Sequence, residues 1–488
     1  MPEKITRQDF LKISATSALG LFLASCGIST GDKKPGKKGG SPDTLTVKDL
    51  HINESGNVVY ITRSDKQYDA LNQGFNKRIQ KYPQVIALCK NTAGVAEAIK
   101  YANANNLEIA VKSGGHSFEC FSANNGGLVV NLSLLNNFEW LNESVVNIGP
   151  GCKLFEVYDE LLPKKRLIPA GSCAGVGIGG LTLGGGYGLF SRKYGLTCDS
   201  LTAITLVDGN GNIHFSKDEP ELLWACKGGG NGNFGVVTEM TFNTFPAPAA
   251  FQSHRLKAFK LDAARAKTIL QKWFEVTEHL PEACFAAFVL NNKTLTILVT
   301  NYEAHSTALQ DALDALSSLC DKTTMGNAIE LQKALKVFYG IQTPIYFKNA
   351  SAGLYKNFDE INDCIEDVLA KVIETPGLIY QVNTLGGRIS ADELESTSAY
   401  AHRALPFLSE LQAYWEKPGT GTRLAETFEE IQGLIKQNGI TAQYVNYPDL
   451  NFENWQQAYY GKNYERLQQV KKKFDPGNNI RHGQSIKA

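Results

Sequence analysis

Two glycine-dense blocks restrict the folds open to this chain of 488 residues. They read GSCAGVGIGGLTLGGGYG at 171–188 and GGGNGNFG at 228–235, and each contains the pattern G-x-G-x-x-G. In a Rossmann fold this pattern follows a strand and opens a helix on the third glycine. Three consecutive glycines after the first match disfavour a helix, at about 1 kcal/mol each. The second match runs into FGVVTEMTF, an alternating strand. We therefore expect neither block to open a helix, and we reject the Rossmann interpretation for both.

A different use of bare backbone explains the blocks better. Glycine lets backbone N–H groups approach a ligand and adopt positive φ. The blocks could be tight turns of a glycine-rich β fold. Together with the pair Gly114 and Gly115, however, they make three such places within one stretch of chain. Loops of this kind that converge from separate strands favour a long groove for an extended dinucleotide.

The hydrophobic pattern divides the chain. Up to about residue 249 it is α/β, with a strand at 85–89, a helix from Thr92 and a hairpin over 201–215 that turns at Asp208–Gly211. From 250 to 440 strands alternate with helices, and the pattern is typical of a sheet with helices on one face. The fold class is therefore α+β. We predict domains at 45–249 and 250–440, and an aromatic-rich terminal segment at 441–488.

Charge and cysteine usage exclude several function classes. Lys plus Arg and Asp plus Glu number 49 each, so the chain has no global field for nucleic acid or an anionic membrane. Ten cysteines include no C-x-x-C pair, and zinc-ligand spacing is absent. We expect no metal site, and a small molecule as the partner. The oligomeric state stays open.

The N-terminus carries export signals. Lys4 and Arg7 precede an apolar run at 13–25, which is too short to span a bilayer. The run ends in Leu-Ala-Ser-Cys26, which resembles a bacterial lipobox, and TRQDFLK resembles a twin-arginine signal with Gln8 in place of the second arginine. We expect a lipoprotein signal peptide at 1–26 and a linker at 27–44. The protein would then be exported to the periplasm or cell surface and touch the membrane only through a lipid on Cys26.

His116 stands behind the Gly-Gly pair in VKSGGHSF (111–118). It could be a turn residue, a metal ligand, or a side chain held against a large flat group. A metal is disfavoured because no ligand spacing accompanies it. The motifs around it decide between the other two.

Four spaced motifs resemble one family. They are VKSGGHSF, PAGSCAGVGIGGLTLGGGYGLFSRKYGLTCDSL (169–201), LLWACKGGGNGNFGVVT (222–238) and YVNYPDL…YYGKNYERLQQVKKKFDPGN (444–478). In this order they resemble the berberine bridge enzyme-like flavoproteins of the vanillyl-alcohol oxidase and p-cresol methylhydroxylase FAD-binding fold. The resemblance covers roughly residues 60–488. It implies a two-subdomain FAD-binding fold plus an α+β substrate domain whose antiparallel sheet is covered by helices.

The resemblance also implies a cofactor attached at two points. His116 matches the family's histidine bonded to the flavin 8α-methyl, and Cys173 matches the cysteine bonded to flavin C6. An imidazole and a thiolate are nucleophiles suited to an electron-poor ring. By the same analogy other residues would bind FAD: the pyrophosphate would contact Ser113, Gly114, Gly115, Ser117, Gly179, Gly180 and Gly184, the adenine side Val237, and the flavin Asn446. Tyr444, which lies close to the flavin in relatives, would belong to the catalytic residues.

The implied chemistry is oxidation of an alcohol. The resemblance assigns the base to Tyr447, the second tyrosine of Y-x-N-Y; with an ordinary pKa near 10, it needs positive charge or hydrogen bonds to take a proton. Sugar-oxidising relatives have an acid where this chain has Asn383, with Gln381 on the same strand face. Val176 matches the residue that leaves an oxygen pocket in plant relatives, so we predict an oxidase that returns H₂O₂. Alternatives are a ring-forming or C–C bond-forming oxidase and, from another class, a non-catalytic flavin-binding protein.

Overall fold

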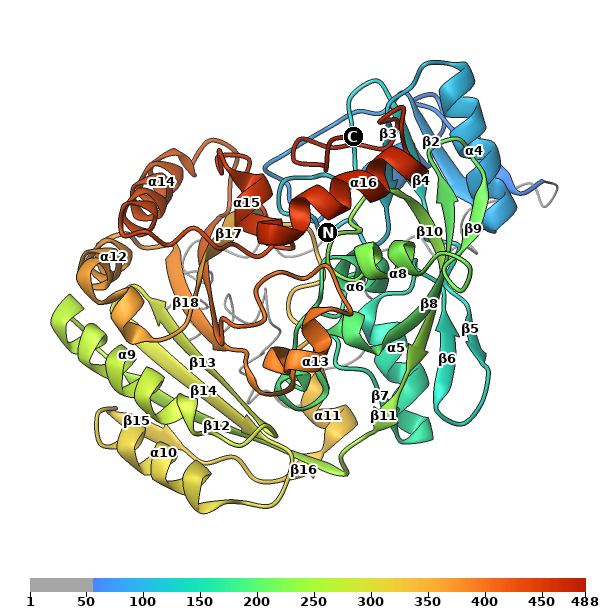
Figure 1. Cartoon of the computed structure of the whole chain (residues 1–488). Coiled ribbons are helices and arrows are strands. Elements are labelled where there is room, and N and C mark those ends of the chain that lie inside the picture. Colours follow the sequence, from blue (N-terminus) through green and yellow to red (C-terminus); the bar gives the residue numbers. More distant parts are fainter. Residues whose placement is uncertain (1–55) are drawn as a thin grey trace.

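The computed structural model describes residues 56–488, so the predicted signal peptide, lipobox cysteine and linker lie outside the described residues. Figure 1 shows two bodies: sheets in blue and green on the right, and a large sheet in yellow and orange on the left. The red terminal segment crosses above both. The combination of a glycine-rich two-sheet part with an α+β part confirms the predicted fold class.

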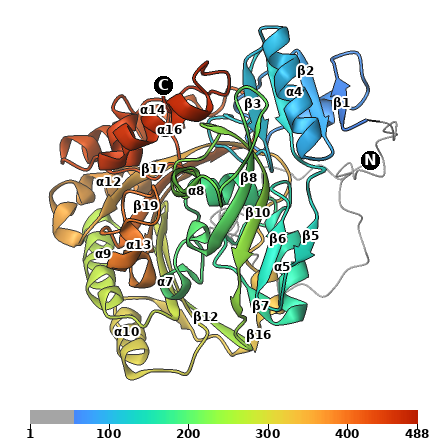
Figure 2. The same ribbon diagram turned by 45° about the vertical axis from the view of Figure 1, so that its right-hand side comes forward.

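The first sheet has the strand order β1-β2-β4-β3, in which β2, β4 and β3 are parallel and β1 is antiparallel. The predicted helix α4 packs on this sheet (Figure 2). Its N-cap is Asn91, whose side chain accepts a hydrogen bond from the Gly94 N–H at 2.9 Å. The elements of this part are β1 (Val58–Ile61), α3 (Tyr68–Asn72), β2 (Val85–Cys89), α4 (Thr92–Ala104), β3 (Ile109–Lys112) and β4 (Leu128–Asn131).

The second sheet is antiparallel, in the order β5-β6-β10-β8-β9. The predicted hairpin is present as β8 and β9. A two-stranded ribbon of β7 and β11 lies below. The elements are β5 (Phe138–Trp140), β6 (Val145–Ile148), α5 (Leu154–Leu161), β7 (Arg166–Leu167), α6 (Ile178–Leu183), α7 (Ser191–Tyr194), β8 (Leu201–Asp208), β9 (Ile213–Phe215), α8 (Pro220–Cys226), β10 (Gly235–Asn243) and β11 (Phe245–Pro246).

The prediction that neither glycine block opens a helix is wrong for the first block. Gly177 is the N-cap of α6, a helix of six residues. The three consecutive glycines follow this helix instead of lying inside it, so they impose no helical penalty. The helix contains Gly179 because this position has no room for a side chain: an added Cβ would lie 2.8 Å from the Pro150 carbonyl oxygen. The second block opens β10 as predicted, and no long parallel strand precedes α6, so neither match belongs to a Rossmann unit.

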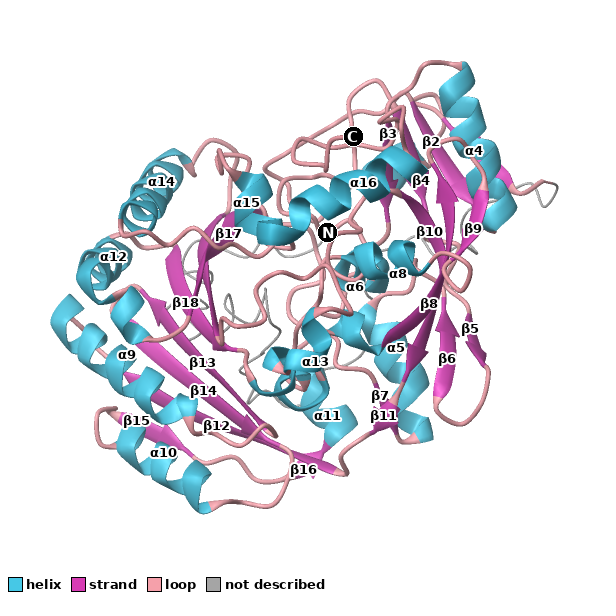
Figure 3. Ribbon diagram, viewed as in Figure 1, coloured by secondary structure: helices cyan, strands magenta, loops and turns pink. Residues whose placement is uncertain are grey.

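The third sheet is antiparallel, in the order β15-β12-β14-β13-β18-β19-β17, with β16 paired to β12. Helices α9, α10, α12 and α14 cover its outer face, as predicted (Figure 3). The elements are β12 (Ala250–Ala258), α9 (Ala263–Glu278), β13 (Cys284–Asn291), β14 (Thr294–Asn301), α10 (Thr307–Ser317), β15 (Lys322–Thr324), β16 (Ile329–Glu330), α11 (Leu331–Lys336), β17 (Tyr346–Tyr355), α12 (Asn362–Glu374), β18 (Leu378–Thr384), α13 (Asp392–Glu395), β19 (Phe407–Trp415) and α14 (Thr422–Gln437).

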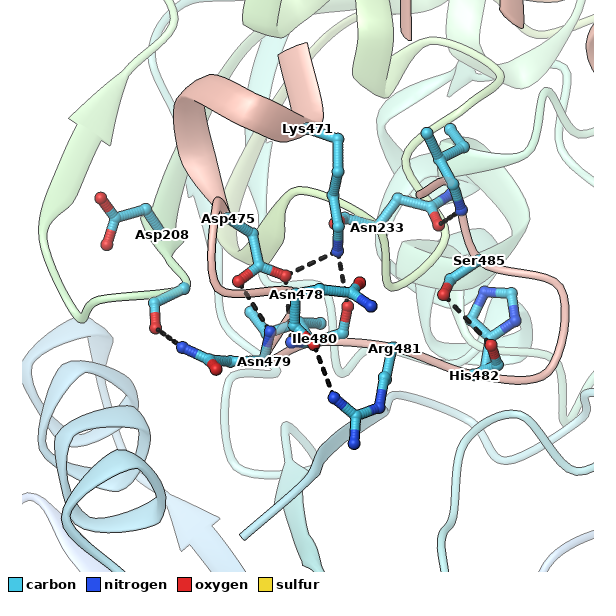
Figure 4. A network of polar contacts seen from close by, with 12 residues as sticks. Asp208, Asn233, Lys471, Asp475, Asn478, Asn479, Ile480, Arg481, His482 and Ser485 are labelled. Carbon is cyan, nitrogen blue, oxygen red and sulfur yellow. Dashed lines mark hydrogen bonds and ion pairs between the residues drawn. The ribbon is translucent and has the colours of Figure 1, made fainter. Parts of the chain in front are cut away.

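The terminal segment returns to the first two sheets through α15 (Trp455–Tyr460) and α16 (Tyr464–Phe474). Figure 4 shows the polar network that fastens it. The fully buried Lys471 ammonium donates to Asp475 at 2.6 Å, to the Asn233 carbonyl at 2.6 Å and to the Ile480 carbonyl at 2.8 Å. The next residues run beside β3, where the Ile109 N–H donates to the Asn479 carbonyl at 3.0 Å. A buried cation therefore ties α16 to the second glycine block.

Candidate active site

A cavity of about 280 Å³ lies where the two glycine-rich sheets face the third sheet. Its walls come from the glycine loops, from the inner face of β13, β14, β17 and β18, and from the terminal segment. Of the catalytic and cofactor-binding residues predicted from sequence, all of which lie within residues 56–488, only Gly184 is outside the lining. The others line it together: Ser113, Gly114, Gly115, His116, Ser117, Cys173, Val176, Gly179, Gly180, Val237, Gln381, Asn383, Tyr444, Asn446 and Tyr447.

Two glycine loops form one wall by close backbone contact. A Cβ on Gly114 would lie 2.3 Å from the backbone N of Gly177, and a Cβ on Gly177 would lie 2.1 Å from Ser113 Oγ. Gly115 has φ +72°, which an L side chain rarely adopts. Within the described residues, no backbone hydrogen bond uses the N–H groups of 114–117 as donors. Unpaired donors in a glycine loop are suited to bind an anionic group.

The triple glycine makes a turn that the terminal segment holds in place. Gly185 and Gly186 have φ of +110° and +78°. The Gly186 N–H donates to the Tyr444 hydroxyl oxygen at 3.0 Å, and Asn446 Nδ2 donates to the same oxygen at 2.9 Å. A Cβ on Gly184 would lie 2.1 Å from Asn446 Oδ1, so Gly184 packs behind the wall of the cavity. Burial raises the pKa of Tyr444, and these contacts favour a structural role for its hydroxyl.

His116 stands at the inner end of the glycine loops. Its ring stacks on Phe75 with centroids 4.2 Å apart, and its Nε2 atom is 2.8 Å from where a Cβ of Gly175 would be. Loss of water contact lowers the pKa of His116 to about 3, with a smaller contribution from the charge of Lys153. The imidazole is therefore neutral at pH 7 and keeps a nucleophilic nitrogen. Cys173, two residues before Gly175, lines the same cavity.

The described part of the chain, residues 56–488, has no cluster of three or more His, Cys, Asp or Glu side chains able to hold a metal ion. No disulfide joins its nine cysteines. None of the helices between residues 56 and 488 is both long and apolar enough to cross a membrane.

The third sheet supplies the opposite wall through side chains on one face. On β19, Glu410 is directly opposite Gln381 of β18, and Gln412 is directly opposite Asn349 of β17. Because strand side chains alternate, residues two apart share this inner face. The face therefore carries a polar cluster next to apolar positions; the cluster consists of Asn349, Gln381, Asn383, Glu410, Gln412 and Tyr414.

The terminal segment brings Tyr447 to this polar cluster. The Ser351 N–H of β17 donates to the Tyr447 carbonyl at 2.9 Å, which fixes the segment against the sheet. The Tyr447 hydroxyl is 2.7 Å from the Tyr187 hydroxyl, and Asn383 Nδ2 donates to Tyr187 at 3.2 Å. The Tyr447 ring also stacks on Phe118, with centroids 5.1 Å apart. Two phenols and the Asn383 amide thus converge beside the glycine loops.

Comparison with known proteins identifies the family. Residues 83–216 match a family described as FAD binding domain, and residues 443–487 match one described as Berberine and berberine like. An FAD-linked oxidoreductase of Bacillus subtilis, YgaK, is 30% identical over 444 residues, which is 87% of this chain and 96% of that protein. The chain therefore belongs to the berberine bridge enzyme-like FAD-linked oxidoreductases. It is an FAD-dependent oxidoreductase.

Two further comparisons agree with this family. A chitooligosaccharide oxidase of Gibberella zeae is 27% identical over 85% of this chain and 89% of its own length. The solved structure of BBE-like 1 from Physcomitrella patens superposes with a TM-score of 0.81 at 22% identity, covering 88% of this chain and 96% of that one. The second likeness confirms the fold.

The glycine-loop wall fits FAD, because its donor groups match the needs of a diphosphate. It offers unused N–H groups at 114–117, and at Gly180 an added Cβ would meet no protein atom within 4 Å. Neutral His116 and Cys173 would lie toward the ring. The residues that would hold the cofactor are thus present.

Sequence reasoning missed four residues around the site: Tyr187, Asn231, Glu410 and Gln412. Tyr187, within Gly-Gly-Gly-Tyr-Gly, could have been found as the one aromatic residue inside a ligand-binding turn. Asn231, which donates to Asn446 Oδ1 at 2.6 Å, lies in the second glycine block and gave a comparable signal. No sequence signal pointed to Glu410 or Gln412, because only the strand register brings them to the site.

Proposed function

We propose that this protein is an oxidase that takes a hydride from an alcohol carbon of a carbohydrate or secondary metabolite and returns H₂O₂. The observation that carries the proposal is the hydroxyl pair of Tyr187 and Tyr447, 2.7 Å apart, in the cavity whose other wall suits a dinucleotide. The names of relatives, among them chitooligosaccharide, glucooligosaccharide and aclacinomycin oxidases, support the same class.

Bound FAD would supply a two-electron acceptor at its ring and would be reoxidised by O₂. The protein's task is to hold it: residues 114–117 would donate to the pyrophosphate, and His116 and Cys173 would each form one covalent bond to the ring. Each attachment would replace one C–H bond of the flavin, and its two electrons would pass to the ring and then to O₂. Mass spectrometry of denatured protein tests the bonds. Wild type should carry the mass of FAD after acid precipitation, and His116→Ala or Cys173→Ala alone should each still carry it. The double variant should lose it, and loss from wild type would contradict the attachment.

Tyr447 would take the proton of the reacting hydroxyl. An alcohol bound between Tyr447 and the ring needs a base at its oxygen while its carbon gives up hydride. Asn383 is an amide, and it can orient a hydroxyl but cannot take a proton. Tyr187 can donate its own hydrogen to the Tyr447 oxygen, which stabilises the phenolate form of Tyr447.

The substrate site combines neutral amides with an apolar wall. Phe285, Leu298, Phe338 and Phe347 line the same cavity as Gln381. A ligand with a hydroxylated part and an apolar face fits both. A screen of sugars, glycosides and phenolic alcohols for bleaching of the yellow flavin tests this assignment. Bleaching by an alcohol with release of H₂O₂ is expected. A cyclised or coupled product would favour the ring-forming alternative, and no bleaching by any compound would favour a binding protein.

Oxygen access is proposed to depend on Val176, which lines the cavity. One extra methylene there would fill space that a molecule as small as O₂ could use. After anaerobic photoreduction, admission of air should reoxidise wild type within seconds and Val176→Leu more slowly. Reoxidation of wild type over many minutes would mean a dehydrogenase.

Export as a lipoprotein is the proposed localisation, supported by the signals at 1–26. The intact chain should label with a radioactive fatty acid at Cys26, and Cys26→Ser should abolish the label. Labelling that survives this substitution would contradict the proposal.

A further inference from the structure

The polar cluster on the third sheet forms a chain of hydrogen bonds in which every donor points the same way. Asn349 Nδ2 donates to the Tyr414 hydroxyl oxygen at 2.8 Å, and Tyr414 donates to Gln412 Oε1 at 3.1 Å. Gln412 Nε2 donates to Gln381 Oε1 at 2.6 Å.

The chain then continues toward the hydroxyl pair. Gln381 Nε2 donates to Asn383 Oδ1 at 2.6 Å, and Asn383 Nδ2 donates to the Tyr187 oxygen at 3.2 Å. Five bonds in sequence thus run toward Tyr187, which is 2.7 Å from Tyr447. Aligned hydrogen bonds polarise one another, so the chain makes Tyr187 a better donor.

Glu410 lies at the far end of this chain. Its side chain has no solvent exposure, and Asn349 Nδ2 donates to its Oε1 at 3.2 Å. Its Oε2 has no hydrogen-bond partner among the described residues. Burial raises the pKa of Glu410 to about 8, while the hydrogen bonds from Asn349 and Gln412 lower it less.

Among the described residues, the side chains that bond to Glu410 or are directly opposite it are neutral. Gln381 and Ser351 are directly opposite it on the neighbouring strands. Asn349 and Gln412 form hydrogen bonds with it. The nearest cation on β17 is Lys348, which pairs with Glu429 and Asp449 and packs over Phe428 of α14, so it belongs to the opposite face of the sheet. A carboxylate at Glu410 would therefore be buried without a countercharge.

We propose that Glu410 is a positioning residue for the base Tyr447: as a neutral carboxylic acid it leaves the amide donors of Asn349 and Gln412 aimed along the chain toward Tyr187. The proposal rests on the proposed role of Tyr447. An ionised Glu410 is a stronger acceptor, and it would draw these donors away from Tyr414 and Gln381. It would also place a negative charge at one end of the chain while a phenolate forms at the other. Ionising Glu410 and Tyr447 at the same time would therefore cost more free energy than ionising either one alone.

Infrared spectroscopy of the purified flavoprotein tests the protonation state directly. The probe is the C=O stretch of a protonated carboxyl group in D₂O, followed from pH 6 to pH 9. Wild type should show the band at pH 6 and lose it with a midpoint near pH 8. Glu410→Gln should lack the band at every pH, and Glu278→Gln, an exposed control on α9, should keep it. A wild type without this band at pH 6, or a band that survives in Glu410→Gln, would overturn the proposal.

The coupling to Tyr447 is tested by the pH profile of flavin reduction, with the alcohol found by the bleaching screen. Wild type should lose at least tenfold in reduction rate as Glu410 ionises above pH 8. Glu410→Gln should lack this alkaline decline, because an amide keeps the neutral shape at every pH. Equal declines in both proteins would overturn the coupling. If no alcohol reduces the flavin, the proposed function fails while the infrared titration still decides the state of Glu410.

A second variant guards against a folding defect. Gln412→Glu places an additional carboxyl next to Glu410 in the same chain and keeps the side-chain volume. The alkaline decline should then begin at a lower pH than in wild type. An unchanged or higher midpoint in a folded Gln412→Glu protein would contradict the proposal.

Discussion

The two walls of the cavity are built by different means. The glycine-loop wall uses backbone: residues 113–117 and 175–180 approach so closely that a Cβ on Gly114 would lie 2.3 Å from another backbone nitrogen. The sheet wall uses side chains from β17, β18 and β19, which the strand register alone brings together. The glycines that close backbone contacts require stand near one another in the sequence, whereas the residues of a side-chain cluster spread over three strands do not. The first wall fits FAD, and the second faces the proposed substrate.

The largest effect is expected where backbone meets backbone. In Gly177→Ala the new Cβ would lie 2.1 Å from Ser113 Oγ and 2.4 Å from the Gly114 nitrogen. The two loops must then separate, and we expect purified protein to retain no FAD by absorbance. Gly433→Ala is the matched control, because a Cβ there meets nothing within 4 Å on helix α14 and should stabilise by about 0.5–1 kcal/mol. Full FAD loading of Gly177→Ala would contradict a backbone-built wall.

This contrast explains what the sequence could predict. His116, Cys173 and the glycines were found because each belongs to a contiguous sequence motif. The hairpin at 201–215 and helix α4 followed from local periodicity. The helix after Gly177 was missed because glycine content was counted over the whole block, while the steric demand of Pro150 on Gly179 is a tertiary contact. Glu410 was missed for the same reason, since its partners lie on other strands.

The terminal segment joins the two walls. Breaking its buried ion pair is expected to have the next largest effect. Lys471→Met would remove the cation and leave Asp475 buried without it. Breaking such a pair costs about 3–5 kcal/mol. Urea unfolding should show this loss in the free energy of unfolding. Lys473→Met, which breaks the exposed pair with Glu219, should change it by less than about 1 kcal/mol. Equal effects of the two variants would show that the network does not fasten the segment.

Tyr187 is where the backbone-built turn meets the side-chain cluster. Tyr187→Phe would delete only the hydroxyl that faces Tyr447 and Asn383. A hydrogen bond to a charged group contributes about 1.5–3 kcal/mol, so flavin reduction should slow by about 10- to 100-fold. Stopped-flow absorbance measures the rate, and reoxidation in air, which needs no substrate base, should be unchanged. A reduction rate equal to that of wild type would show that the Tyr187 hydroxyl does not assist Tyr447.

The smallest effect concerns stability in the sheet wall. The pKa of Glu410 is about 8 in the folded protein and near 4.5 when unfolded, so between these values the native state binds one more proton. The free energy of unfolding should then fall with rising pH by about 1.4 kcal/mol per unit from this group. Urea unfolding at pH 6 and pH 7 should show that Glu410→Gln removes this part of the slope. A parallel pH dependence in both proteins would contradict it.

The central claim is that Tyr447 removes the hydroxyl proton while the alcohol carbon gives up its hydride. The most direct measurement is single-turnover flavin reduction by the alcohol from the screen, in wild type and in Tyr447→Phe, without oxygen. General base catalysis contributes about 10²–10⁴-fold, so the variant should reduce its flavin that much more slowly while retaining its full complement of FAD. A Tyr447→Phe protein that reduces its flavin at the wild-type rate would contradict the account.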